Sequence, residues 1–123
     1  MNISRHEQVI QNFLAENLLW QRKGLRKAIA KEMEDPSCVF HLGFIPDAFF
    51  IASNCVYLLE VDGHSHLEPS KLSKLLQLWG LLDFHGWHME LITINLFTET
   101  KSITTDSDFE KLWNDELCAY ALA

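Results

Sequence analysis

Residues 46–62 read PDAFFIASNCVYLLEVD, and this stretch decides the fold. It contains two apolar runs rich in aromatic and β-branched residues, Ala48–Ala52 and Cys55–Leu59. Such runs favour strands, and the Ser53-Asn54 pair between them favours a tight turn. The stretch therefore predicts a β-hairpin.

Acidic residues border this hairpin at both ends, with Asp47 before the first run and Glu60 and Asp62 after the second. Side chains alternate between the two faces of a strand, so Glu60 and Asp62 should share a face. If Asp47 lies on the neighbouring strand near the same end, three carboxylates could converge on Mg²⁺ or Mn²⁺. The alternative is a strand that ends in solvated turn residues, because Asp-Gly is also an ordinary turn signal.

Composition predicts one domain covering residues 1–123. The chain has 123 residues, 48% of them hydrophobic, which is enough apolar material for a single core. No apolar run approaches the roughly 20 residues of a membrane span, so we expect no membrane contact. Three widely spaced cysteines without a Cys-x-x-Cys pair favour the reducing cytoplasm over a disulfide framework.

The remaining chain alternates between helical and strand patterns. Ser4 followed by Glu7 forms a capping box that starts a helical periodicity running to Met33, continuing after Gly24. A strand–helix–strand crossover in the second half implies at least one parallel strand pair. We expect a strand over Cys38–Ile45, a helix from Pro69 to about Gly86, a strand over Trp87–Asn95, a polar loop over Thr98–Asp106 and a helix over Asp108–Tyr120. The predicted core contains Phe13, Val56, Leu58, Val61, Leu76, Trp79, Ile92 and Ile94.

Positive charge is concentrated in one segment of an acidic chain. The net charge is −7, yet five of the ten Lys and Arg residues lie between residues 22 and 31. On a helix, Arg22 with Arg26 and Lys23 with Lys27 would form a basic stripe able to follow a phosphate backbone. The alternative is a solvated helix face paired with Glu32 and Glu34.

The order αβββαβ, with Pro46-Asp47 opening a strand and Glu60-x-Asp62 closing the next, resembles the PD-(D/E)XK nuclease superfamily. The string from Leu59 to His66, LEVDGHSH, looks more like the branch of very-short-patch-repair endonucleases and related small domains. The resemblance implies an α/β, restriction-endonuclease-like αβββαβ core with a mixed central sheet flanked by helices, plus a C-terminal helix. In that branch an N-terminal helix also carries a glutamate, here matched by Glu7.

The resemblance implies a metal-dependent DNA endonuclease. Asp47, Glu60 and Asp62 would hold Mg²⁺ or Mn²⁺, with Glu7 as a further catalytic residue that could help to hold the ion. The motif lysine is missing because Asp62 occupies its position, so we expect His66 to handle protons, alone or with His64 sharing a metal. Lysines of the next helix could replace the missing cation. We expect DNA contacts from Arg22, Lys23, Arg26, Lys27, Lys71 and Lys74.

The rival hypothesis is a nuclease fold that has lost catalysis and serves as a protein- or nucleic-acid-interaction module. The acidic balance favours this rival, since an acidic surface suits a basic partner better than a phosphate backbone. In either case the chain is little more than a core, so target recognition would need a homodimer or a separate targeting protein.

Overall fold

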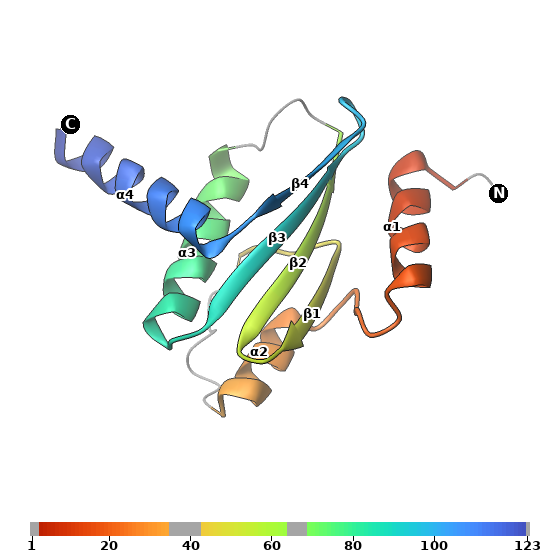
Figure 1. Ribbon diagram of the computed structural model, residues 1–123, viewed down its shortest axis with the longest axis horizontal. Helices are drawn as coiled ribbons and strands as arrows, with labels where there is room; N and C mark the ends of the chain where they lie inside the picture. Colours follow the sequence, from red (N-terminus) through yellow and green to blue (C-terminus); the bar gives the residue numbers. More distant parts are fainter. Residues whose placement is uncertain (1–2, 35–42, 64–68, 123) are drawn as a thin grey trace.

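The computed structural model describes residues 3–34, 43–63 and 69–122, with side chains as far as Glu116. The described residues form a four-stranded mixed sheet with helices packed around it (Figure 1). The predicted α/β class is confirmed. In chain order the elements are α1 (Arg5–Glu16), α2 (Leu25–Met33), β1 (Ala48–Ala52), β2 (Cys55–Asp62), α3 (Pro69–Phe84), β3 (His88–Asn95), β4 (Thr100–Thr104) and α4 (Asp106–Leu122).

The sheet has the order β1-β2-β3-β4. β1 and β2 form the predicted hairpin, in which Ala48 is opposite Leu59, and both turn residues, Ser53 and Asn54, have positive φ. β2 and β3 are parallel, as the predicted crossover through α3 requires, and β3 and β4 are antiparallel. Consequently β2 lies inside the sheet, with its last residues beside the start of α3.

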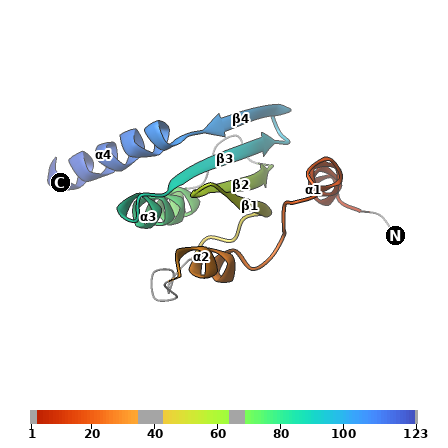
Figure 2. The same cartoon turned by 60° about the horizontal axis from the view of Figure 1, so that its bottom comes forward.

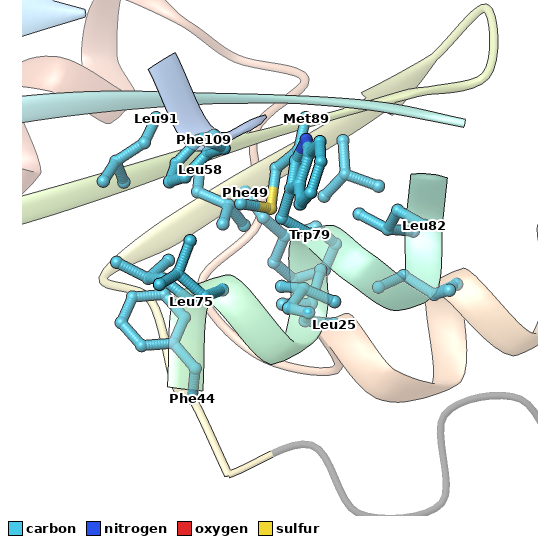
Figure 3. Packing of buried hydrophobic residues seen from close by; sticks show 14 residues of the cluster. Leu25, Phe44, Phe49, Leu58, Leu75, Trp79, Leu82, Met89, Leu91 and Phe109 are labelled. Atoms are coloured by element: carbon cyan, nitrogen blue, oxygen red, sulfur yellow. The ribbon is translucent and has the colours of Figure 1, made fainter. Parts of the chain in front are cut away.

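The two faces of the sheet carry separate apolar clusters. Val56 and Leu58 of β2 pack with α2 and α3, and Figure 3 shows Leu75, Trp79 and Leu82 of α3 in this larger cluster. On the other face, Leu59 and Val61 pack against Ile10 of α1. Figure 1 shows α1 and α3 on opposite sides of the sheet, and Figure 2 shows α2 on the side of α3. The predicted core is confirmed, with Phe13, Ile92 and Ile94 half-buried and the other five buried.

The N-terminal helical pattern forms two helices where the sequence predicts one periodic run. Residues 17–24 leave the helix, and Gln21 exchanges two backbone hydrogen bonds of 2.8 Å with Phe49 of β1. Trp20 packs edge-on against Phe13 with ring centroids 4.8 Å apart. Gly24, at φ +92°, then starts α2 in a conformation that favours glycine. Pairing with an edge strand and packing of Trp20 against Phe13 therefore outweigh local helix propensity.

The predicted loop over Thr98–Asp106 is wrong, because it contains β4. This strand is polar and mostly exposed, so it lacks the alternating apolar pattern that predicts strands. In the sheet that the structure describes, β4 is an edge strand that pairs with β3. The predicted strand over Cys38–Ile45 lies largely outside the described residues, and its described part, residues 43–45, forms no strand.

Cys55 is a free thiol, and the side chains of the other two cysteines lie outside the described residues. Among the helices that the structure describes, none is both long and apolar enough to cross a membrane.

Candidate active site

Two buried carboxylates end β2 on the face covered by α3. Strand alternation places Glu60 and Asp62 on the same face as Val56 and Leu58, which belong to the α3 cluster. Each of the two acids is only 4% exposed. A buried carboxylate is costly unless it is paired or hydrogen-bonded, so these two positions need partners.

Lys71 supplies a partner for Glu60. It lies in the first turn of α3, and its Nζ is 2.6 Å from Glu60 Oε1. The crossover from β2 to α3 is short, so the start of the helix stays next to the end of the strand. The sequence offered Lys71 or Lys74 of the next helix as a source of the missing cation, and the structure places Lys71 at Glu60. Lys74, one turn later, lies with its aliphatic carbons beside Gly43.

Asp47 lies where the β1–β2 ladder ends. Its backbone N–H donates to the Leu59 carbonyl at 2.9 Å, and its carboxylate Oδ2 accepts from the Val61 N–H at 2.7 Å. The side chain thus occupies the position that a further residue of β1 would take. Asp47 therefore has a structural role, as a cap on the free end of the hairpin, whatever else it does.

His6 of α1 lies beside Asp47 and Val61, and no sequence pattern identified it as a site residue. Its Nε2 is 2.9 Å from the Val61 carbonyl and 3.6 Å from Asp47 Oδ2. Because a carbonyl only accepts, Nε2 carries the proton in this arrangement. His6 thus places an imidazole beside Asp47.

Electrostatics link the three carboxylates. Burial raises the pKa of Glu60 above its ordinary value, and the charges of Asp47 and then Asp62 raise it further. The hydrogen bond and charge of Lys71 act in the opposite direction. A like charge raises the pKa of a carboxyl only from close by, so this end of the sheet gathers the predicted acids around Glu60, and Asp47 acts more strongly on the pKa of Glu60 than Asp62 does.

Glu7 is engaged by a cation. Its backbone N–H donates to Ser4 Oγ at 3.1 Å, as in half of the predicted capping box. Both carboxylate oxygens accept from Arg22, with Oε2 2.8 Å from Nη2, and this hydrogen bond is the main reason that the pKa of Glu7 is lowered. Asp47 also contributes to the raised pKa of Arg22. The structure thus joins Glu7 to the acid cluster through Arg22, not as a direct neighbour of Glu60.

The expected three-ligand metal group is not formed. Within the residues that the structure describes, no three His, Cys, Asp or Glu side chains come together in a way that could hold a metal. Magnesium, however, is commonly held by one or two carboxylates together with water and substrate phosphates. The Asp47 and Glu60 pair, which interacts across the hairpin end, fits that smaller donor set. His64 and His66 lie outside the described residues.

The basic segment divides between two environments. Arg22 lies before α2 and pairs with Glu7, while Lys23, Lys27 and Lys31 line a cavity between α2 and β1. Arg22 and Lys23 are not helical, so the predicted continuous helical stripe is wrong.

Comparison with protein-family models gives no match for this chain, and a search among curated proteins gives none.

Proposed function

We propose that this chain is a metal-dependent DNA endonuclease with a restriction-endonuclease-like core, centred on Asp47, Glu60 and Lys71. The observation that carries the proposal is the 2.6 Å contact between Lys71 Nζ and Glu60 Oε1. A nuclease of this kind needs two acids and a cation, and the sequence lacks the cation at its usual place, where Asp62 stands. Lys71 brings that cation to the same glutamate from the next helix.

Each residue has a separate task. Asp47 and Glu60 would hold Mg²⁺ or Mn²⁺, which when bound neutralises phosphate charge and activates water. Lys71 would orient Glu60 and present positive charge to the scissile phosphate. His6, beside Asp47, is the proton-transfer candidate within the described residues, and His66 keeps the role that the sequence predicts for it.

The second candidate is a non-catalytic interaction module on the same fold. This candidate is supported by the partners that the two acids already have within the protein. Asp47 accepts a hydrogen bond from the Val61 N–H, and Glu60 is paired with Lys71. Such pairing is what a structural network at the end of a sheet would also need. The two candidates differ in whether the acids exchange these partners for a metal.

Manganese titration by calorimetry distinguishes the two candidates. We expect wild type to bind one Mn²⁺ with roughly micromolar to millimolar affinity and Asp47→Asn to bind none. The asparagine keeps an oxygen for the Val61 N–H, so the cap survives. Asp83→Asn, an exposed position on α3, is the matched control and should bind as wild type. Absence of Mn²⁺ binding by wild type would favour the interaction module, as would equal binding by Asp47→Asn.

A further inference from the structure

A basic cavity lies between α2 and the outer edge of β1. Its volume is about 570 Å³, and the residues that line it include three lysines and one acid of α2 and its approach, Lys23, Lys27, Lys31 and Glu32, with Phe50 and Ile51 of β1. The spacing of four residues places Lys27 and Lys31 on one side of α2, and Lys23 lies in the approach to the helix. Figure 1 shows α2 beside the end of β1. The lysines therefore face a hollow next to an edge strand.

A second cavity continues the first toward the candidate active site. It measures about 380 Å³ and shares Lys23 and Gly24 with the first cavity. Arg22, Arg26 and Pro46 also line it, and Pro46 directly precedes Asp47. We call the surface that the two cavities line, from Ile51 past the shared Lys23 to Pro46, the α2 track.

The α2 track combines strong positive charge with exposed apolar surface. Residues 22–31 carry five cations and no acid, in a chain of net charge −7. Arg22 is paired with Glu7, and Glu32 is the acid that lines the first cavity, so the lysines and Arg26 outnumber the acid. Leu19 and Ile45, which line the two cavities, are 73% and 84% exposed. Phosphates match the cations, and the apolar faces of unpaired bases can pack against these aliphatic side chains. A duplex keeps its bases stacked inside and would leave that apolar surface without a partner.

We propose that the α2 track binds a single strand of nucleic acid and leads it to Asp47 and Glu60. The destination of the strand rests on the proposed endonuclease function, whereas binding along the track does not. The bridge between Gln21 and Phe49 fixes the approach to α2 against β1, so the lysines are held beside the track by the fold. Unpaired DNA, such as a flap or an opened region, is thus the substrate class that this surface selects.

Fluorescence anisotropy with a labelled oligothymidylate of about 12 nucleotides tests the proposal, with EDTA present to prevent cleavage. Lys27→Gln/Lys31→Gln should bind at least about tenfold more weakly than wild type at low salt, and its slope of log K against log salt should be shallower by about 1.4. Lys101→Gln/Lys111→Gln removes the same charge from β4 and α4 and should bind as wild type. Circular dichroism of both double variants checks the fold.

Three results would overturn the proposal. They are equal loss in both double variants, wild-type binding by Lys27→Gln/Lys31→Gln, and preference for a duplex or for an oligoglutamate peptide over the oligothymidylate. The two proposals fail separately. A wild type that binds through the track but cuts no DNA keeps this inference and removes the endonuclease. A wild type that cuts DNA while Lys27→Gln/Lys31→Gln binds normally keeps the endonuclease and removes the track.

Discussion

Lys71, at the start of α3, pairs with Glu60, at the end of β2, with 2.6 Å between Nζ and Oε1. The Glu60 side chain is 5% exposed and that of Lys71 36%, so the carboxylate is buried while the ammonium reaches solvent. The lysine opposes the burial and the like charges that raise the pKa of Glu60.

Removal of Lys71 should therefore raise the pKa of Glu60 further. Lys71→Met keeps much of the aliphatic stem but removes the charge and the hydrogen bond that favour the ionised carboxylate. The measurement is an NMR titration of the Glu60 side-chain carboxyl carbon in wild type and variant. Lys74→Met serves as the control and should leave the titration unchanged. An unchanged Glu60 titration in Lys71→Met would show that the ion pair is absent in solution.

The stability of the protein should depend on the ionisation of Glu60. The folded-state pKa is raised above the unfolded value, so the contribution of Glu60 is fully present below its ordinary pKa of about 4.3 and is lost as pH rises through the raised value. Compared with Glu60→Gln, which cannot ionise, wild type should lose stability over that window. Urea unfolding of both proteins across the window measures the difference. Wild type gaining on the variant as pH rises would mean that Lys71 outweighs burial.

Asp106, the first residue of α4, should be a main anchor of the C-terminal helix. Its Oδ1 accepts from Trp79 Nε1 at 3.1 Å and from the Met89 N–H at 2.9 Å, joining α3, β3 and α4. Asp106→Ala leaves both donors without this acceptor, and we expect a loss of about 2–3 kcal/mol in the free energy of unfolding. Asp106→Asn should lose less because it keeps an oxygen acceptor. Urea unfolding with Asp115→Ala as an exposed control checks this, and an equal effect at both positions would refute the anchor.

The contributions of Glu7 and Ser4 to stability should differ in how they depend on pH. The pKa of Glu7 is lowered, mainly by Arg22, so its stabilising contribution exists above the ordinary pKa and disappears as pH falls. Glu7→Gln should be less stable than wild type at neutral pH and equal to it at about pH 2–3, where carboxylates are protonated. Ser4→Ala removes a helix cap that does not titrate and should cost about 1 kcal/mol at both pH values. Urea unfolding at the two pH values measures both effects. A Glu7→Gln deficit that persists in acid would assign Glu7 to packing or capping rather than to the ion pair.

Local sequence patterns predicted the hairpin and the crossover, because both depend on residues that are close in the sequence. The hairpin follows from two β-prone runs around Ser53-Asn54, and the crossover follows from a strand, an apolar helix and a second strand. The sequence did not predict β4, because an exposed edge strand needs no apolar face. The sequence did not predict the interruption of the helix at residues 17–24. Its cause is the pairing of Gln21 with Phe49, which is 28 positions away in the sequence.

The candidate site also has parts that local patterns predict and parts that they do not. Strand alternation predicts that Glu60 and Asp62 share a face, and the hairpin brings Asp47 to the same end. The partners of these acids depend on how helices pack, which no local pattern specifies. His6 reaches Val61 from the opposite face of the sheet, across 55 positions of sequence. Lys71 was predicted as a possible substitute for the motif lysine, but its choice over Lys74 needed the placement of α3.

Cleavage of DNA tests the central claim most directly. Covalently closed plasmid and single-stranded circular DNA are incubated with Mg²⁺ or Mn²⁺ and wild type, Glu60→Gln, Lys71→Met or Lys101→Met, and nicked and linear products are measured over time. We expect cleavage by wild type that EDTA abolishes, a loss of about 10²-fold or more in Glu60→Gln and Lys71→Met, and retained activity in Lys101→Met, which changes an exposed lysine of β4. No metal-dependent cleavage by wild type, or equal cleavage by all four proteins, would contradict it.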